Sequence, residues 1–350
     1  MRVLQLDAGR EWRGGQNQVR LLTRELAREP EVEQQLATKR DGELARRAAA
    51  EGVTVRGVRW TISLDPRAAF DLLLLMNEFR PDVVHAHDSH SLALARWTRR
   101  WVDWAADPPP LVATRRVDFH VRRGSGWFHA ETVIAVSGAV RRVLVADGMP
   151  ETAITIIPDG IDPGEVRTRA ATPLDIRARL GLAPGTPLAV NVAALVDHKD
   201  QRTMIRAAAH ARSARPDLRW AIAGDGALRH RLEREIAQQG VGDIVRLLGY
   251  VIEVDALIRE ADVFVMSSKE EGLGSVILHA LALGKPVVAT AAGGIPEVLP
   301  ASCLVPIGDA VALSHKVLES LERPTPSSLP PQFTSKSMAQ ATLALYRSLV

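Results

Sequence analysis

Two series of short apolar runs, each alternating with stretches of helical periodicity, are the strongest constraint on the fold of this chain. The runs are rich in β-branched residues, and such alternation predicts parallel strands joined by crossover helices. In the first series the predicted strands are 2–6, 35–38, 53–58, 82–86, 111–114, 132–136 and 154–157. The predicted helices are 17–28, 43–50, 66–79, 91–105 and 139–146. The first half of the chain is therefore expected to form a doubly wound α/β sheet.

A second series follows residues 158–164, where two prolines and two glycines interrupt the pattern. Its predicted strands are 188–193, 219–223, 245–248, 263–266, 286–290 and 303–306, and its helices lie near 200–213, 226–238, 252–260, 274–283 and 310–322. We predict two Rossmann-like domains, 1–160 and 161–335, with a last helix in 336–350 that crosses back to the first domain. Two such domains would face each other across a cleft, with ligand at the carboxyl ends of both sets of strands.

The compartment follows from what the sequence lacks. No apolar run approaches the roughly 20 residues of a membrane-spanning helix. Charges at Asp7, Arg10 and Glu11 interrupt the first residues, which is not the pattern of a signal peptide. The single cysteine, Cys303, excludes an internal disulfide and a cysteine-ligated metal cluster. We expect a cytoplasmic protein.

The charge balance argues against a nucleic-acid partner. The 44 basic and 41 acidic residues give a net charge of +3, and only six of the basic residues are lysines. A duplex-binding domain shows a basic face and a recognisable motif, and neither is present in this sequence.

The most informative stretch is residues 267–290, where a predicted strand ends at Met266 and a glycine-bearing loop leads into a helix that starts near Gly274. The backbone amides of Gly274, Ser275 and Val276 would be unpaired at that helix N-terminus, which favours an anion such as phosphate. Glu271 precedes them, where its carboxylate can accept hydrogen bonds from sugar hydroxyls. The alternative is an ordinary capped helix with a solvated carboxylate.

This stretch resembles the signature of the family-4 retaining glycosyltransferases of the GT-B fold. The match runs from Glu271-Gly-Leu-Gly274 through an Ala-x-Ala-x-Gly-x-Pro-Val-Val-Ala segment. Further matches come in the family's order over nearly the whole chain: Gly14-Gly15, 84–88, 135–137, 157–162, 223–228 and 293–297. Their joint order and spacing are specific, although each alone is weak.

The resemblance implies a role for each matching residue. Lys199 corresponds to the lysine that contacts the diphosphate of the donor, and Glu271 to the acid that contacts its sugar. Two glycine loops also match the family: Gly14 and Gly15 on the first domain, and Gly224, Asp225 and Gly226 on the nucleotide side. A surface lysine and plain strand-to-helix turns are the alternatives, and a lone Gly-x-Gly is a weak signal.

Three positions depart from the family pattern. His279 stands where the family has a second acid that holds the ribose, and a neutral imidazole offers fewer acceptors than a carboxylate. Ala194 replaces an arginine near the lysine. Where the family often has a histidine after the fifth strand, this chain has Arg115 and Arg116. We hypothesise that Arg116 binds the donor's diphosphate in place of the missing arginine.

Three histidines, His85, His87 and His90, raise the question of a metal site. Strand alternation puts His85 and His87 on one face, but no acid cluster completes a ligand set. The resemblance also implies catalysis without a metal. We predict that His87 lies in the cleft with a polar role toward the acceptor, and the alternative is a structural histidine.

The predicted helix 91–105 carries Trp97, Trp101 and Trp104 at helical spacing. Three arginines stand beside them: Arg96, Arg99 and Arg100. One interpretation is a peripheral contact with a membrane, at whose interface Trp and Arg are favoured. The other is that the tryptophans pack on the sheet while the arginines face water.

The resemblance implies transfer of a hexose-type sugar from a UDP- or GDP-type donor to a glycan or lipid-linked acceptor. The anomeric configuration would be retained and no cofactor would be needed besides the donor itself. Cell-envelope glycan synthesis, at the inner face of the membrane, is one expected setting. A nucleotide-sugar epimerase of the same fold is an alternative, and so is a catalytically silent binding or scaffold protein, for which His279 and Ala194 are the argument.

Overall fold

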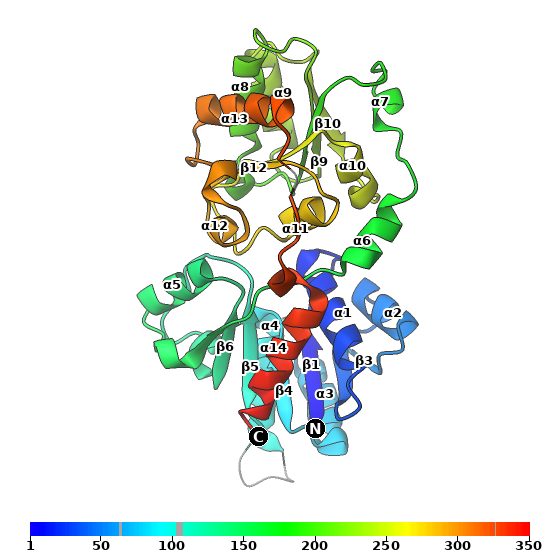
Figure 1. Cartoon of the computed structure of the whole chain (residues 1–350). Helices are drawn as coiled ribbons and strands as arrows, with labels where there is room; N and C mark the ends of the chain where they lie inside the picture. Colours follow the sequence, from blue (N-terminus) through cyan, green and yellow to red (C-terminus); the bar gives the residue numbers. More distant parts are fainter. Residues whose placement is uncertain (63–64, 103–107, 326) are drawn as a thin grey trace. The chain divides into compact units, whose positions relative to one another are not determined.

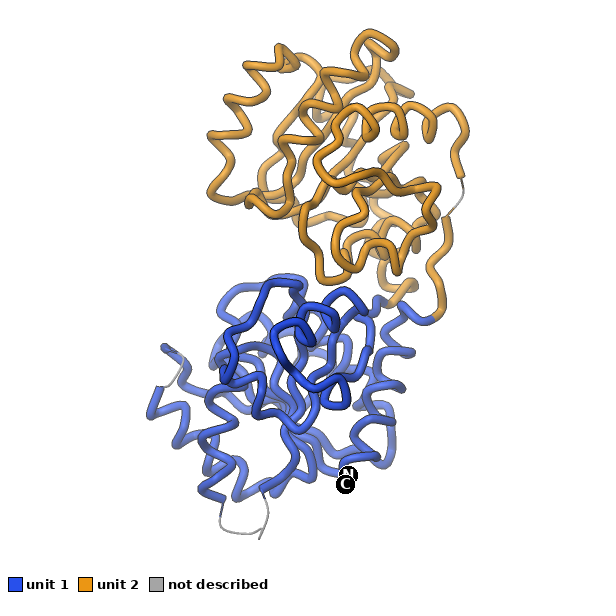
Figure 2. Tube along the Cα trace, turned by 90° about the vertical axis from the view of Figure 1, so that its left-hand side faces the viewer, with its two compact units in different colours: residues 1–161, 332–350 blue, residues 162–331 orange. Residues whose placement is uncertain are grey.

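The computed structural model describes residues 1–62, 65–102, 108–325 and 327–350, and the chain divides into two compact units (Figures 1 and 2). Unit 1 comprises Met1–Ile161 together with Gln332–Val350, and unit 2 comprises Asp162–Pro331. Each unit contains one parallel sheet with helices packed on it, as the alternating sequence pattern predicts. No helix in the described ranges is long and apolar enough to cross a membrane.

Unit 1 has a seven-stranded sheet in the order β3-β2-β1-β4-β5-β6-β7, with every neighbouring pair parallel. The strands are β1 Arg2–Asp7, β2 Glu33–Lys39, β3 Val55–Val58, β4 Val83–Ala86, β5 Leu111–Arg115, β6 Thr132–Ala135 and β7 Ile154–Ile156. The helices are α1 Gly14–Leu26, α2 Glu43–Ala50, α3 Pro66–Phe79, α4 Ser89–Thr98, α5 Gly138–Ala146 and α14 Ser335–Arg347, with 3-10 turns η1 Arg99–Trp101, η2 Gly126–His129 and η3 Glu151–Ala153.

Unit 2 has a six-stranded parallel sheet in the order β10-β9-β8-β11-β12-β13. Its strands are β8 Leu188–Val192, β9 Arg219–Ala223, β10 Val245–Gly249, β11 Val263–Met266, β12 Val287–Thr290 and β13 Leu304–Val305. Its helices are α6 Pro163–Ala170, α7 Ile176–Arg179, α8 Gln201–Ala211, α9 Arg229–Gln238, α10 Val254–Glu260, α11 Ser275–Ala282, α12 Ile295–Val298 and α13 Ala310–Glu322, with 3-10 turns η4 Asp197–Lys199 and η5 Ala301–Cys303; η6 Pro331–Phe333 leads back into unit 1.

The last helix, α14, completes the core of unit 1. Its side chains Met338, Leu343 and Tyr346 are buried with those of α1 and with Val3 of β1. The return of the chain to unit 1 is tight, because a Cβ on Gly160 would lie 2.3 Å from the carbonyl oxygen of Thr334. Right-handed crossovers put α1 and α2 on one face of this sheet and α3 to α5 on the other.

The strand order reverses between β1 and β4 in unit 1 and between β8 and β11 in unit 2. At such a switch point the connecting loops leave in opposite directions, which opens a crevice beyond the carboxyl ends of the strands. The loops that follow β1, β4, β8 and β11 are therefore the places where a site can form. They carry Gly14, His87, Lys199 and Glu271 respectively.

The predicted helix 91–105 differs from the structure. The helix α4 ends at Thr98, and Trp97 and Trp101 are 54% and 63% exposed, so the prediction that the tryptophans pack on the sheet is wrong for these two. Trp104 lies outside the described residues. The reason is that small and aliphatic side chains already occupy the inward positions of α4: Ser91, Leu92, Leu94, Ala95 and Thr98.

Candidate active site

Lys199 and Glu271 form an ion pair at the switch point of unit 2, although they lie 72 residues apart in the sequence. Lys199 ends the η4 turn after β8, and Glu271 stands in the loop after β11. Ser268 Oγ also donates to Glu271 Oε1 at 3.0 Å. The side chains of Lys199 and Glu271 are only 19% and 8% exposed, so these charges are held in one geometry rather than solvated. The solvated surface lysine and carboxylate of the sequence-based alternatives are therefore not what the structure contains.

The N-terminus of α11 follows this pair. Gly274 is the N-cap residue with φ +80°, a left-handed conformation, and no side chain within the described residues caps the helix. The helix starts at Ser275, one residue after the predicted start. The amides of Ser275 and Val276 belong to the first turn, whose N–H groups have no acceptor inside the helix. A cation and a helix N-terminus thus lie on the same edge of one sheet.

His279, on the same helix, is held by Asp255 of α10, which is itself paired with Arg169 of α6. Its Nδ1 lies 2.6 Å from Asp255 Oδ1, and Asp255 Oδ2 accepts from Arg169 Nε at 2.6 Å. Burial works to raise the pKa of Asp255, but the His279 ring and the Arg169 guanidinium outweigh it and hold that pKa below its usual value. Asp255 thus holds the ring through Nδ1, which leaves Nε2 as the ring nitrogen that a ligand could contact.

The loop Gly224–Gly226 packs against its own unit. Gly224 and Gly226 have φ of +141° and +155°, and an added Cβ would lie 1.9 Å from the carbonyl oxygen of Ala193 and 2.6 Å from that of Leu195. The Asp225 carbonyl accepts from the amide of Leu195 at 3.0 Å. These glycines are therefore required by the approach of two backbone segments, and only the exposed Asp225 side chain points to solvent.

In unit 1, His87 lies just after β4 and is 5% exposed. His87 Nε2 lies 2.8 Å from Gln5 Oε1, so it is the protonated nitrogen, and Nδ1 faces Arg116 Nη2 at 3.5 Å. Burial, with His85 and Arg116 nearby, lowers the pKa of His87 well below its ordinary value. The ring is neutral and has a partner on both nitrogens, which favours the structural alternative for this histidine.

Arg116 forms hydrogen bonds with two separate segments of unit 1, at His87 after β4 and at Asp159 after β7. Its Nε donates to Asp159 Oδ1 at 3.1 Å, and its Nη1 donates to the His87 carbonyl at 3.4 Å. Burial raises the pKa of Asp159, and the Arg116 charge opposes this shift. The Arg116 side chain is 14% exposed. In the structure this guanidinium thus neutralises a buried carboxylate.

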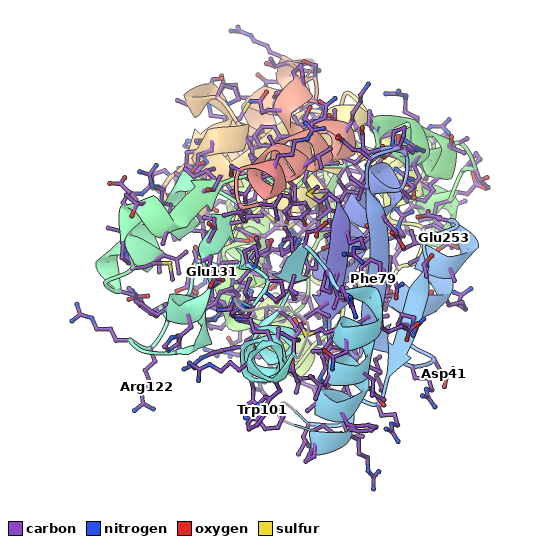
Figure 3. The ribbon with its side chains drawn as sticks, turned by 90° about the horizontal axis from the view of Figure 1, so that it is seen from below. Asp41, Phe79, Trp101, Arg122, Glu131 and Glu253 are labelled. Carbon is purple, nitrogen blue, oxygen red and sulfur yellow. The ribbon has the colours of Figure 1, made fainter. Side chains whose placement is uncertain are left out.

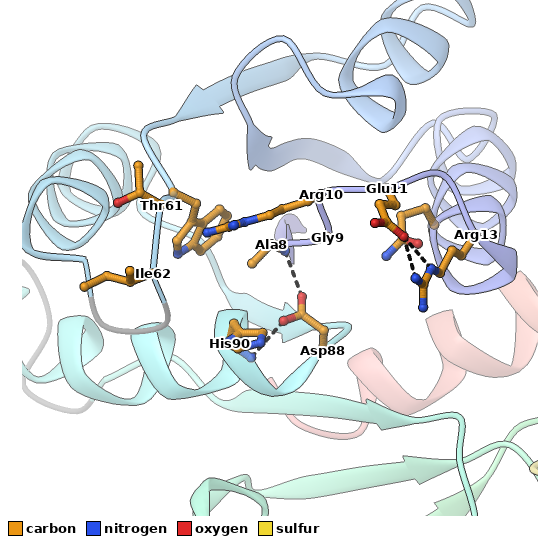
Figure 4. A pocket seen from close by; sticks show the side chains of 11 residues that line it. Ala8, Gly9, Arg10, Glu11, Arg13, Thr61, Ile62, Asp88 and His90 are labelled. Carbon is orange, nitrogen blue, oxygen red and sulfur yellow. Dashed lines mark hydrogen bonds and ion pairs between the residues drawn. The ribbon is translucent and has the colours of Figure 1, made fainter. Parts of the chain in front are cut away.

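Unit 1 has a cavity of about 510 Å³ at the carboxyl ends of β1 and β4 (Figure 4). Asp88 lies at its edge and accepts from the amides of Ala8 and His90, both at 2.8 Å (Figure 4). Trp60 also lines the cavity, although its indole N–H is buried from solvent and has no hydrogen-bond partner in the described chain. Polar and aromatic groups of this kind suit a sugar ring.

Gly14 and Gly15 begin α1 beside this cavity. Arg13 is the N-cap residue and its side chain does not cap the helix. A Cβ on Gly15 would meet no atom within 4 Å, so packing does not require a glycine there. Open space at a helix N-terminus agrees with a loop that a ligand can approach.

Asp7, at the end of β1, has a perturbed acidity that sequence reasoning missed. It is 1% exposed, and burial together with the nearby Asp88 raises its pKa to about 6. The folded chain therefore keeps a proton that the unfolded chain releases near pH 4, and stability falls as the pH rises from about 4 to 6.

We expect Asp7→Asn to remove this pH dependence, making the variant more stable than the wild type at pH 7 by up to about 3 kcal/mol. Urea denaturation between pH 4 and 7 measures it, with the exposed Glu253→Gln as the control. Identical slopes for Asp7→Asn and the wild type would contradict the prediction.

Several site residues had no signal in the sequence. Asp255, which holds His279, and Arg169, which pairs with Asp255, stand on helices far from it in the chain. Tyr346 lies 2.6 Å from His85 Nδ1 and accepts from Gln5 Nε2 at 3.1 Å, although it is 261 residues from His85. These contacts arise from tertiary packing. Only Asp7 could have been found, as an acid at the carboxyl end of a predicted strand.

Two family models match the chain over nearly its whole length. "Glycosyltransferase Family 4" matches residues 12–165, and "Glycosyl transferases group 1" matches residues 174–335. Their boundary falls close to the boundary between the two units.

Curated relatives are similar over part of their length. A GDP-mannose-dependent monoacylated alpha-(1-6)-phosphatidylinositol monomannoside mannosyltransferase of Corynebacterium glutamicum is 36% identical over 182 residues, 48% of this chain and 47% of that protein. A 2-deoxystreptamine glucosyltransferase of Streptomyces kanamyceticus is 29% identical over 226 residues, 62% of this chain and 56% of that protein. The chain thus spans about half the length of the curated relatives it matches.

Solved structures share the whole fold. HepE of Anabaena in complex with UDP-glucose has a TM-score of 0.81 at 19% identity and covers 100% of both chains. A glycosyltransferase of Rickettsia africae has a TM-score of 0.83 at 16% identity, covering 99% of this chain and 98% of that one. At these identities the likeness concerns the fold alone.

Proposed function

The chain belongs to the family-4 glycosyltransferases of the GT-B fold, and from this premise we propose that it transfers a hexose-type sugar from a nucleoside diphosphate donor to an acceptor hydroxyl. The observation that carries the proposal is the Lys199–Glu271 pair beside the N-terminus of α11. A diphosphate leaving group develops negative charge as its bond to the sugar breaks. The largely buried Lys199 and the first-turn amides of α11 are hydrogen-bond donors held in place, and such donors stabilise that charge.

Each donor-side group has a distinct part in this proposal. Lys199 and the amides of Gly274, Ser275 and Val276 bind the diphosphate, and Glu271 accepts hydrogen bonds from the sugar. The exposed Asp225 contributes on the nucleotide side, while Gly224 and Gly226 shape the loop that presents it. HepE, in the same fold, has been solved with UDP-glucose bound, and we propose a UDP- or GDP-type donor here.

We propose that the reaction retains the anomeric configuration and uses no metal. Retention through attack on the same face as the departing diphosphate requires no protein nucleophile. The positive charge that a metal supplies in other transferases would come from Lys199 and the helix amides. Hydroxyl attack on the anomeric carbon releases the nucleoside diphosphate, which takes the bonding electron pair and accepts the hydroxyl proton.

His279 is proposed to bind the donor ribose through its free Nε2. In this proposal Nδ1 donates to Asp255, and Nε2 accepts a hydrogen bond from a ribose hydroxyl, as a carboxylate would. In this proposal the contact takes the place of the missing second acid.

We expect His279→Ala to weaken binding of the preferred ribonucleoside diphosphate about tenfold, the value of one lost hydrogen bond. The same substitution should weaken binding less for one of the two matching deoxynucleoside diphosphates, 2′-deoxy or 3′-deoxy. That one is the ligand that already lacks the hydroxyl contacted by His279. Calorimetric titration measures both. Equal losses for the ribo and both deoxy ligands would refute the ribose contact.

Arg116 is the second proposed phosphate ligand, from unit 1. Since it also neutralises the buried Asp159, the test variant is Arg116→Gln combined with Asp159→Asn, which leaves no unpaired charge. We expect affinity for the nucleoside diphosphate to fall about tenfold, in line with a charged hydrogen bond. The neighbouring Arg115→Gln is the control. Unchanged affinity of the double variant for the nucleoside diphosphate would refute the proposal that Arg116 binds phosphate.

The acceptor is proposed to occupy the unit 1 cavity beside Gly14 and Gly15. His87 directly precedes Asp88 of the cavity lining, and its carbonyl positions Arg116 by accepting from Nη1. Two relatives are named for a phosphatidylinositol mannoside and for 2-deoxystreptamine. We propose a glycan or lipid-linked acceptor, with cell-envelope glycan synthesis as the setting.

A thermal-shift panel of UDP, GDP and ADP and their sugars tests the function, because a ligand that binds only the folded chain raises the melting temperature. We expect the nucleotides of one base to raise the melting temperature. The nucleotide sugar of that base should also be hydrolysed slowly. Conversion of UDP-N-acetylglucosamine without any acceptor would indicate an epimerase instead. No shift with any ligand and no hydrolysis would indicate a binding or scaffold protein.

A further inference from the structure

Unit 1 exposes a group of large apolar side chains on two neighbouring helices. Phe70 and Leu74 on α3 are 58% and 52% exposed, and Trp97 and Trp101 on α4 and η1 are 54% and 63% exposed. We call these four residues the aromatic face. α3 packs against both α4 and η1, and the two indole rings lie 6.3 Å apart between centroids. In Figure 3 Trp101 projects from the ribbon beside α4.

The periodicity of both helices explains the exposure. Phe70 and Leu74 are four residues apart on α3, whose buried positions include Ala69, Leu72 and Met76. Trp97 and Trp101 are likewise four apart. Each helix thus turns one side to the sheet and presents a large apolar pair to solvent, where a folded chain gains nothing from it. Exposed apolar groups of this size that are clustered rather than scattered mark an interaction surface.

Among the described residues of α3, α4 and η1, the charged side chains that lack an ion-pair partner are arginines. Arg67 on α3, Arg96 on α4 and Arg100 on η1 form no ion pair within the described ranges, and Arg67 and Arg100 are exposed. The acids on the outer side of α3 are already paired: Asp71 with Arg59 at 2.7 Å and Glu78 with Arg56 at 2.5 Å. Arg99 pairs with Glu131 at 2.8 Å.

This combination selects among the kinds of partner. A second copy of the chain docking face to face would bring two sets of three unpaired arginines into one interface, and like charges repel. An anionic lipid surface complements them, since each cation near such a surface contributes favourably. Tryptophan is also the side chain that prefers the headgroup region, where its ring is half in hydrocarbon and its N–H is hydrated.

We propose that the aromatic face binds the surface of an anionic lipid bilayer, with Trp97, Trp101, Phe70 and Leu74 entering the headgroup region and Arg67, Arg96 and Arg100 contacting lipid phosphates. Contact is peripheral, through the sides of α3 and α4. The proposal does not depend on sugar transfer, because the face shares no residue with the donor groups or the cavity and its test measures binding alone.

Co-sedimentation of the full chain with vesicles tests the proposal. We expect binding to vesicles of phosphatidylcholine with phosphatidylglycerol at about 0.15 M salt, and little binding to phosphatidylcholine alone. Trp97→Ser with Trp101→Ser should lower the partition coefficient at least about tenfold, as should Arg96→Gln with Arg100→Gln. Tyr250→Ser with Ile252→Ser, which removes side chains that are 69% and 78% exposed on unit 2, is the matched control and should leave it unchanged.

Three results would overturn the proposal. The first is no binding of the wild-type chain to the anionic vesicles, and the second is equal binding by the tryptophan double variant. The third is a wild-type dimer in sedimentation velocity that the tryptophan double variant converts to monomer, which would make the face a self-interface. Donor thermal shift measured on the same variants is expected to match the wild type, so a failure here is separable from a failure of the transferase assignment.

Discussion

Replacing Lys199 with alanine is expected to lower kcat/KM for sugar transfer by about two to three orders of magnitude, the usual effect of removing one donor aimed at a developing oxyanion. The loss should lie mostly in kcat, since the charge on the diphosphate grows as the sugar departs. Steady-state kinetics with the preferred donor from the thermal-shift panel measures it. Activity equal to the wild type would refute the assignment of this residue.

Stability has to be separated from chemistry in this experiment, because Lys199→Ala leaves Glu271 8% exposed without its cation. An unpaired charge of this kind costs about 1–3 kcal/mol. The double variant Lys199→Met with Glu271→Gln removes both charges and should recover most of the stability while staying inactive. Lys269→Ala is the matched control and should keep both activity and stability. Lys269 stands in the loop that carries Glu271, is 44% exposed and lies 3.8 Å from Asp200.

Replacing Gly224 with alanine is expected to lower the free energy of unfolding of unit 2 by about 3 kcal/mol or more, within the range of the severe single substitutions. The new Cβ would stand 1.9 Å from the carbonyl oxygen of Ala193, and the backbone φ of +141° is one that alanine rarely adopts. This overlap could be relieved only if the ends of β8 and β9 moved apart. For a unit of this size the melting temperature should fall by roughly 6–12 °C in scanning calorimetry.

Gly240→Ala separates the two causes of this loss. Gly240 also has a positive φ, +64°, but a Cβ there meets no atom within 4 Å. It should cost only about 1–2 kcal/mol, the cost of the left-handed conformation. If Gly224→Ala melted like Gly240→Ala and lost donor affinity instead, the glycine would act on the ligand rather than on the fold.

The strands and most helices could be predicted because their signals are local. Buried parallel strands show as runs such as Val263–Met266, and β8, β9 and β11 lie within one or two residues of the predicted ranges. Helix 91–105 failed because a tryptophan at helical spacing carries no information about which side of the helix faces the sheet. That side was decided by Leu92, Leu94 and Ala95, which fill the inward positions.

The candidate site could likewise be predicted only in part. The resemblance to a family singled out Lys199 and Glu271 as partners of one ligand, and their ion pair brings them together. It could not reveal that Asp255 holds His279 and pairs with Arg169, nor that Arg116 pairs with Asp159. Those pairs join residues 24 to 86 positions apart, and no spacing rule relates them.

The sequence by itself determined that this chain forms two parallel α/β sheets, because hydrophobic periodicity and glycine and proline breaks act over a few residues and survive without any knowledge of packing. It also carried the order of motifs by which the chain resembles the family-4 glycosyltransferases. Only the tertiary structure decided the protonated nitrogen of His87, the partner of His279, the raised pKa of Asp7 and the exposure of Trp97 and Trp101. Each of these depends on burial and on charges from distant segments, and electrostatic and solvation energies are set by proximity in space rather than along the chain.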